Sequence, residues 1–245
     1  MKVSVCIATY NGSNYIKDQI NSILCQLSDY DEIIISDDNS SDNTIDIIKE
    51  FNDDRIILIR NQYKHGATYN FENALKNVKG DYIFLSDQDD IWMPEKLATM
   101  IHYLKYFDLV ISDCIVVDSD NKVINDSYFA LVNSRKGFFK NIVKNSYLGC
   151  CMAFNRYVLQ KSLPFPRNLV AHDIWIGLIS EIYGNVAFID TKLIFYRRHG
   201  SNLSYAAMKS SNSFIYKVKY RVVLIFQIFF KIIKSYFNEN YNTYF

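Results

Sequence analysis

The sequence has almost no net charge and no cysteine pattern that would indicate a disulfide framework. The formal net charge at pH 7 is +1 over 245 residues, so the chain as a whole is not strongly basic, and we predict no nucleic-acid partner. Its five cysteines form no CxxC pair. They are therefore typical of reduced thiols that pack as small hydrophobic side chains in a cytoplasmic protein.

Long apolar runs, repeats and linkers are also absent from the sequence. The longest uncharged stretch of the C-terminal segment, residues 222–230, has nine residues, whereas a membrane-spanning helix needs about 20 apolar residues. Met1 and Lys2 lead directly into a strand-like run, so no signal peptide is expected. Because 49% of the residues are apolar, the chain can form a sizeable core, and its length suits one large domain with an appendage.

The charge is divided unevenly along the chain. From Lys209 onward there are six basic residues and one acidic residue, so this tail has a net charge of +5 and the preceding part −4. Apolar residues recur at helical spacing from Phe214 to Phe237, with lysine and arginine between them. The pattern predicts a basic amphipathic helical tail over residues 206–245, which favours an anionic membrane surface. A helix packed on the body, or a dimer contact, is the alternative.

Strand-like and helix-like segments alternate in the first half of the chain. This alternation predicts an α/β domain with a mostly parallel central sheet flanked by helices. Right-handed crossovers place the turns that follow the strands along one edge, where open α/β sheets bind ligands. The strands are expected at residues 3–8, 32–36, 55–60 and 82–85, and the helices at 15–27, 44–51 and 68–78.

The second half has a mixed α/β pattern and is expected to cover an edge of the same sheet rather than fold alone. Leu163-Pro164-Phe165-Pro166 reads as an extended loop, and Gly184 suits the end of a helix. The remaining predictions are strands at 109–112, 148–154, 186–189 and 193–197, a hairpin within 116–124, and helices at 138–143 and 174–183.

An acidic turn follows the strand at 82–85. This strand is apolar throughout, as expected for burial on both faces, and Pro94 suits the first turn of a following helix. Between them lie the carboxylates of Asp87, Asp89 and Asp90. Their repulsion grows as the site loses water, and Mg²⁺ or Mn²⁺, which prefer carboxylate oxygens, would remove it. The alternative is a solvated acidic loop that caps the helix at Met93.

Five segments, in order and with matching spacing, resemble the family 2 glycosyltransferases of bacteria. The resemblance covers about residues 1–205 and implies a GT-A (nucleotide-diphosphosugar transferase) fold, with a donor-nucleotide half at 1–107 and an acceptor half at 108–205. The motifs around Asp87, His172 and Tyr196 look most like the branch that holds many rhamnosyltransferases, as well as glucosyl- and galactosyltransferases. The segments are residues 5–11, 35–40, 80–92, 172–175 and 196–202.

The resemblance implies an inverting, metal-dependent sugar transfer. Asp89 matches the metal ligand, Asp87 is expected to face the donor ribose and the metal, and His199 is a further candidate contact to the metal or diphosphate. The expected cofactor is Mg²⁺ or Mn²⁺, which stabilises the departing diphosphate. Asp173 matches the catalytic base. The alternative for Asp173 is an N-cap of a helix that begins at Ile174, and whether burial or the helix N-terminus controls its pKa stays open.

The resemblance also implies a donor of the UDP-sugar or dTDP-sugar class. Asp38 matches the position that accepts the N3–H of a pyrimidine, whereas Asp37 is expected to bond its own turn. Arg197 and Arg198 are candidate phosphate partners. His65 and His102 are interpreted as surface or packing residues, His172 as a loop-orienting or acceptor residue, Trp175 as core, and Trp92 as core or sugar-stacking. The other expected donor-binding residues are Ala8, Thr9, Tyr10, Asn11, Asn70 (alternatively an exposed helix residue) and Gln88.

The acceptor is inferred from the basic tail and from the habits of the family. A polyprenyl-linked glycan of O-antigen or capsule biosynthesis, reached by peripheral association with the inner face of the plasma membrane, fits both. A catalytically silent nucleotide-sugar-binding scaffold is the alternative. A nucleotidyltransferase is disfavoured, because a Gly-rich, basic signature does not follow the first strand.

Overall fold

We analysed a computed structural model that describes residues 1–62, 64–199 and 213–241, without the side chains of 214, 236 and 238–241. Part of the predicted family segment, residues 200–202, therefore lies outside the described residues. So do the predicted boundary between residues 205 and 206, and Lys209, the first basic residue of the tail.

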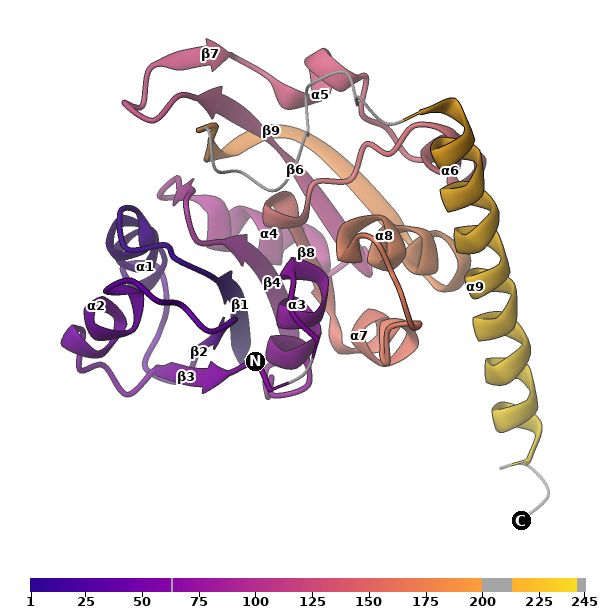
Figure 1. Cartoon of the computed structure of the whole chain (residues 1–245), viewed down its shortest axis with the longest axis horizontal. Coiled ribbons are helices and arrows are strands. Elements are labelled where there is room, and N and C mark those ends of the chain that lie inside the picture. The colour runs from indigo at the N-terminus through magenta and orange to yellow at the C-terminus, as the bar shows by residue number, and fades with distance from the viewer. Residues whose placement is uncertain (63, 200–212, 242–245) are drawn as a thin grey trace.

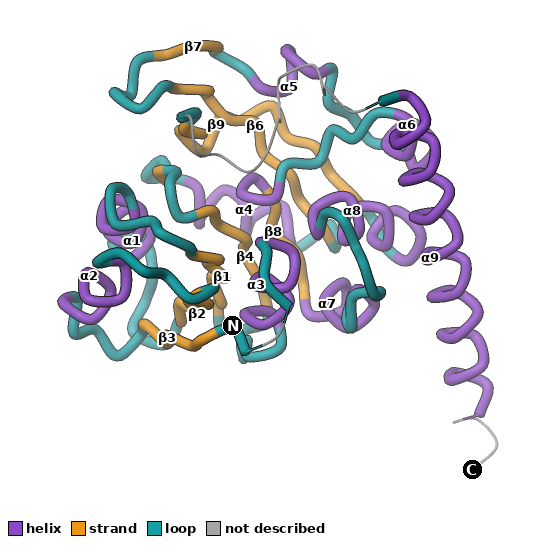
Figure 2. The backbone as a smooth tube through the Cα atoms, in the orientation of Figure 1, coloured by secondary structure: helices purple, strands orange, loops and turns teal. Residues whose placement is uncertain are grey.

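The described chain forms one curled sheet with helices on both faces (Figures 1 and 2). The strand order is β3-β2-β1-β4-β8-β6-β9-β5, with β7 paired to β6. The four strands of the first half are mutually parallel, and β8 joins them to β6 by antiparallel pairing. The predicted mostly parallel α/β sheet is confirmed. The strands are β1 (Val3–Thr9), β2 (Glu32–Asp37), β3 (Ile56–Arg60), β4 (Tyr82–Asp87), β5 (Ile91–Trp92), β6 (Leu109–Val117), β7 (Val123–Asn125), β8 (Met152–Asn155) and β9 (Val186–Arg197).

Helices on the two faces cover two separate clusters of the core. Alternate side chains of one strand enter different clusters, as the period of a strand requires: Ile33 and Ile35 lie on one face, and Ile34 on the other. Helices α1, α2 and α4 cover the first face; α3, α7, α8 and α9 cover the second. The helices are α1 (Ile16–Leu24), α2 (Thr44–Glu50), α3 (Ala67–Leu75), α4 (Lys96–Leu104), α5 (Tyr128–Val132), α6 (Phe138–Val143), α7 (Arg156–Ser162), α8 (His172–Tyr183) and α9 (Phe214–Tyr241).

The register of the sheet brings the expected turns together. Thr9 at the end of β1 lies opposite Asp37 at the end of β2, and Ala8 lies opposite Asp87 at the end of β4. Asn11, in the turn after β1, has φ 48, a left-handed conformation that asparagine tolerates. The predicted ligand-binding edge therefore exists as one row of turns.

The predicted strand at 148–154 is wrong in its first half. Gly149–Cys151 forms a 3₁₀ turn, and the strand begins only at Met152. The turn directs the carbonyl oxygen of Cys150 to the buried Nζ of Lys96, 2.8 Å away, so this carbonyl accepts from a side chain rather than a neighbouring strand. Strand propensity was overridden here by a tertiary hydrogen bond.

Other boundaries also differ from the predicted ones. The strands expected at 186–189 and 193–197 are one strand, β9, whose register against β6 shifts near Asp113. The helix expected to begin at Met93 begins at Lys96 instead, and a two-residue strand, β5, precedes it. No side chain caps this helix, so the interpretation of the acidic turn as a helix cap is wrong. The hairpin between β6 and β7 is confirmed, whereas α5 and α7 were not predicted.

The C-terminal helix α9 runs along one side of the body (Figure 1). Leu224 and Ile228 are buried against the core, whereas Phe226 and Phe229 are 58% and 55% exposed. In the described part of the chain, no helix is long and apolar enough to cross a membrane.

Candidate active site

A cleft of about 790 Å³ opens at the row of turns that follow β1, β2 and β4. The second half of the chain contributes the 3₁₀ turn at Gly149, the start of α8 and the end of β9 to its lining. Eleven of the site residues expected from the sequence line this cleft: Ala8, Thr9, Tyr10, Asn11, Asp38, Asn70, Asp87, Gln88, Asp89, Asp173 and His199.

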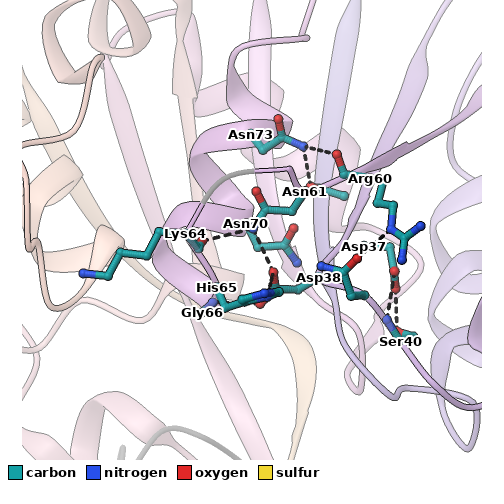
Figure 3. Close-up of polar contacts among 12 residues, drawn as sticks. Asp37, Asp38, Ser40, Arg60, Asn61, Lys64, His65, Gly66, Asn70 and Asn73 are labelled. Atoms are coloured by element: carbon teal, nitrogen blue, oxygen red, sulfur yellow. Dashed lines mark hydrogen bonds and ion pairs between the residues drawn. The ribbon is translucent and has the colours of Figure 1, made fainter.

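Asp38 lines the cleft and is held there by Asn61, His65 and Gly66 (Figure 3). Its Oδ1 accepts from Asn61 Nδ2 at 2.8 Å and lies 3.1 Å from His65 Nδ1. Its Oδ2 accepts from the backbone N–H of Gly66 at 2.7 Å. Because a carboxylate oxygen offers two acceptor positions, Oδ2 can accept one further N–H. The carboxylate is thus fixed in place with capacity for a ligand donor.

Asp37 has the local role expected of a turn residue. The backbone N–H of Ser40 donates to its Oδ2 at 3.0 Å, which closes the turn after β2 (Figure 3). The two adjacent aspartates therefore differ in function: Asp37 shapes the loop, whereas Asp38 lines the cleft.

Gln88 and Asn70 support the turn after β1. The Oε1 of Gln88 accepts from Thr9 Oγ1 at 2.6 Å and from Tyr10 N at 2.9 Å, so the amide is used by this turn. Asn70 is buried rather than exposed on its helix; its Nδ2 donates to the carbonyl of Thr9 at 3.1 Å, and its Oδ1 has no hydrogen-bond partner among the described residues.

The acidic turn after β4 divides its carboxylates between two environments. Asp89 Oδ2 lies 2.8 Å from His199 Nε2, and the ring of His199 stacks on Tyr15. Asp90 is fully buried, and its Oδ1 accepts from the backbone N–H of Arg197 at 3.0 Å. Asp90 is therefore part of the interior that ties the turn to β9, whereas Asp87 and Asp89 face the cleft.

Three carboxylates that line the cleft, Asp87, Asp89 and Asp173, lie close enough to affect one another's charge. Burial, followed by the charges of Asp89 and Asp173, raises the pKa of Asp87 to about 8. Asp87, Asp90 and Cys150 also place possible ligand atoms within 4.8 Å of one another. A thiol is a poor ligand for Mg²⁺ or Mn²⁺, so the hard oxygens of Asp87 and Asp89, with His199 beside them, are the better donor set for these ions.

Asp173 lies across the cleft, in the first turn of α8. The helix begins at His172 and its N-cap is Ala171, so the interpretation of Asp173 as an N-cap is wrong. Burial raises the pKa of Asp173 to about 6, although the N–H of Ile174 and the side chain of Asn145 stabilise the carboxylate. Burial therefore outweighs the start of the helix, and the carboxylate is a stronger base than a solvated aspartate.

His172, beside Asp173, is a neutral packing residue. Its ring stacks on Phe71 with the ring centroids 4.1 Å apart, and burial lowers its pKa to about 3. Gly149 leaves room for it, because a Cβ at this position would lie 2.9 Å from His172 Nε2. His172 thus fixes the wall of the cleft next to Asp173.

Three other expectations need correction. Arg197 and Arg198 are not among the residues that line the cleft; Arg197 is buried, with its guanidinium carbon 4.6 Å from the ring centroid of Tyr15. Trp92 is buried against Phe84 and is not available to stack on a sugar, whereas Trp175 is a core residue as predicted.

His65 and His102 were both interpreted as surface or packing residues. His65 lines the cleft, whereas His102 is not among its lining residues. Asn61, Gly66 and Tyr15 were also not recognised as supports of Asp38 and His199. A partial signal was present, because Gly66 precedes the α3 helix and has φ 113, a conformation that favours glycine.

Comparison with known proteins identifies relatives over most of the chain. The family model "Glycosyl transferase family 2" matches residues 4–163. The chain is 31% identical over 205 residues to the UDP-Glc:alpha-D-GlcNAc-diphosphoundecaprenol beta-1,3-glucosyltransferase WfaP of Escherichia coli. This alignment covers 82% of this chain and 79% of that protein. It is 28% identical over 231 residues to the dTDP-rhamnosyl transferase RfbG of Shigella flexneri, over 82% of this chain and 76% of that protein.

A solved structure has the same architecture. The crystal structure of S. aureus TarS 1–349 in complex with UDP-GlcNAc matches with a TM-score of 0.70, at 20% identity, over 92% of this chain and 66% of that chain. At this identity the likeness establishes the fold alone. Because the family model spans well over half of the residues and the fold agrees, the chain belongs to glycosyl transferase family 2 and is a glycosyltransferase with the GT-A fold.

Proposed function

We propose that the protein is an inverting, metal-dependent glycosyltransferase that moves a sugar from a UDP- or dTDP-sugar to a polyprenyl-linked glycan in surface-polysaccharide biosynthesis. The observation that carries the proposal is that one cleft is lined by Asp38, by Asp87 and Asp89 and by Asp173. Rhamnose, glucose and galactose are the candidate sugars. WfaP and RfbG support the two donor classes, since their names specify UDP-Glc and dTDP-rhamnosyl donors.

The base of the donor nucleotide is proposed to bind at Asp38. Uracil and thymine both present an N3–H donor, and Asp38 Oδ2 has room for one further donor beside Gly66 N–H. Guanine also has a ring N–H, but it is a two-ring base and therefore larger than uracil or thymine. The position of Asp38 therefore favours UDP and dTDP over GDP.

The diphosphate is proposed to lie over the acidic turn. Asp87 and Asp89 would hold Mg²⁺ or Mn²⁺, with His199 as a further contact, and the bound ion would supply charge stabilisation to the departing diphosphate. Asp87 and Asp89, whose charges repel each other, would then share a cation.

Asp173 is proposed to remove the proton from the acceptor hydroxyl. Oxygen then attacks the anomeric carbon from the side opposite the diphosphate, the bond from this carbon to the diphosphate oxygen breaks, and its electron pair leaves with the nucleoside diphosphate. A pKa of about 6 leaves Asp173 mostly ionised at neutral pH and basic enough to accept this proton.

The acceptor is proposed to be reached at the inner face of the cytoplasmic membrane. Helix α9 presents exposed phenylalanine and aliphatic side chains, which suit the boundary between headgroups and acyl chains. WfaP, whose name specifies an alpha-D-GlcNAc-diphosphoundecaprenol acceptor, supports an acceptor of this kind.

Transfer to synthetic alpha-D-GlcNAc-diphosphate-lipid, with UDP- and dTDP-sugars and Mn²⁺, tests the proposal. Wild-type protein should transfer sugar, EDTA should stop the reaction, and Asp173→Asn should reduce kcat about 10²–10⁴-fold while still binding nucleotide. The matched control is Asp118→Asn, a substitution in the β6–β7 turn outside the cleft lining. Wild-type kcat in Asp173→Asn would exclude Asp173 as the base.

A further inference from the structure

Lys96 is a buried lysine that the proposed reaction does not use. It is the first residue of α4 and is 0% exposed. Burial of a lysine is costly unless its amine finds partners in the interior. The Nζ of Lys96 donates to the Cys150 carbonyl at 2.8 Å and lies 4.8 Å from the ring centroid of Trp92. These two contacts fix the position of the amine in the core.

The 3₁₀ turn Gly149–Cys151 receives this hydrogen bond at its middle residue. Strand β8, which follows the turn directly, lies between β4 and β6, and the turn packs against both of these strands. Its backbone is therefore inside the protein, where a carbonyl that lacks a donor would destabilise the conformation. The amine of Lys96 supplies the donor and so stabilises the turn.

The same turn borders the proposed base. Gly149 lines the cleft, and a Cβ at this position would lie 2.9 Å from His172 Nε2 and 3.8 Å from the Cβ of Asp173. The ring of His172 stacks on Phe71 with the ring centroids 4.1 Å apart. A displaced turn would therefore either press on this ring or release it, and the ring lies next to Asp173 in the chain.

We propose that Lys96 is a positioning residue for the reaction, because its hydrogen bond to the Cys150 carbonyl fixes the turn that borders the base, Asp173. Lys96 is not among the residues that line the cleft, so it acts through the turn and not on a ligand. This role rests on the proposed function of Asp173. The competing role for Lys96 is to offset the charge of the acidic turn, in which Asp90 is also buried.

Two substitutions of equal side-chain length separate the hydrogen bond from the charge. Lys96→Met removes both, whereas Lys96→Gln removes the charge and keeps an N–H donor. We expect Lys96→Met to lower kcat roughly 10- to 100-fold, the effect of up to about 1 Å of misplacement at a reacting group, and Lys96→Gln to lower it less. The matched control, Lys105→Met at the exposed C-cap of the same helix, should leave kcat unchanged. Equal losses in the two Lys96 variants would overturn the proposal.

A double-substitution cycle with Asp173→Asn tests whether Lys96 acts through the base. Lys96→Met should lower kcat in the wild-type background but should not lower it further in Asp173→Asn, because the group that it positions is already lost. Binding of UDP and dTDP with Mn²⁺ should be the same in the wild-type chain and in Lys96→Met. Losses that multiply in the cycle, or weaker nucleotide binding, would assign Lys96 to the acidic turn and overturn the proposal.

NMR of the histidine rings tests the positioning without any sugar transfer. The chain has four histidines, whose Cε1–H signals can be assigned by substitution: His65, His102, His172 and His199. The signal of His172 should shift in Lys96→Met, because its ring moves relative to Phe71, whereas the signals of His65 and His102 should stay in place. An unmoved His172 signal in a folded variant would contradict the role of Lys96.

These measurements also separate a failure of this inference from a failure of the proposed function. A wild-type chain that transfers no sugar and binds no nucleotide would reject the proposed function, whereas the His172 signal would still show whether Lys96 holds the turn. If circular dichroism shows that Lys96→Met is unfolded, Lys96→Gln replaces it in the cycle and in the spectra. Its His172 signal should then shift, and an unmoved signal would overturn the inference.

Discussion

The protonation state of Asp173 links a single residue to the pH dependence of the reaction. Its carboxylate is the form that accepts a proton, and burial raises its pKa to about 6. We therefore expect kcat/KM to fall as the pH decreases through about 6 and to be level above it. Initial rates at saturating Mn²⁺ measure this, with Asp173→Asn as the reference that should lack this limb. A midpoint near 4 would mean that Asp173 is solvated in the working enzyme.

Gly149 has a role that only its neighbours explain. A Cβ there would lie 2.9 Å from His172 Nε2 and 3.8 Å from Asp173 Cβ, so Gly149→Ala must shift the ring that packs beside the base. We expect a fall in kcat of roughly 100-fold, the effect of about 1 Å of misplacement at a reacting group. Nucleotide binding should change little, because Asp38 is held by Asn61, His65 and Gly66 and not by the His172 ring. A variant with normal kcat would show that the His172 ring can move without consequence.

At the scale of elements, α9 combines a packing stripe with an exposed apolar side. Leu224 is buried in the same cluster as residues of α8, so Leu224→Ala should lower the free energy of unfolding by about 2–5 kcal/mol, measured by urea denaturation. Phe226→Ser with Phe229→Ser, at exposed positions, should change stability by about 0.5 kcal/mol or less but weaken binding to anionic vesicles. Strong destabilisation by the exposed pair would indicate that this side of α9 packs against protein.

Two strand pairings join the first half of the chain to the second, one through β8 and one between β5 and β9. Strand β8 has a partner from each half. It pairs antiparallel with β4 on one side and with β6 on the other. The elements that place Asp87 and Asp173 are therefore parts of one hydrogen-bonded sheet and the helix packed on it, which keeps the two carboxylates at fixed positions across the cleft.

At the scale of the whole molecule, the two halves share a core. Cys6 and Ile34 from the first half lie in the same cluster as Phe154 and Trp175 from the second. We expect one cooperative unfolding transition. Trp92 and Trp175, both buried and one in each half, allow a test: in Trp92→Phe and in Trp175→Phe, the fluorescence and far-UV circular dichroism midpoints should coincide within each variant. Separate midpoints would show two folding units with a boundary near residue 107.

Much of this fold could be predicted from local pattern. Ile16, Ile20 and Ile23 repeat at helical spacing and are all buried, and the apolar residues of β1, β2 and β4 are those of central strands. The failures occurred where a distant group decides the local structure, as at Cys150, whose carbonyl accepts from Lys96. A buried lysine, 54 residues away in sequence, leaves no periodic signal.

By itself, the sequence determined the alternating α/β order and the edge of the sheet at which the turns gather, because spacing and residue type act locally; its resemblance to family 2 glycosyltransferases indicated many of the side chains that line the cleft. Tertiary structure alone decided how these side chains are used. Burial raised the pKa of Asp173, a hydrogen bond from β9 holds Asp90 in the interior, and the contact of α9 with the 163–167 loop created a groove whose cations lie far apart in the chain. Desolvation and charge proximity depend on distance in space, which linear spacing does not contain.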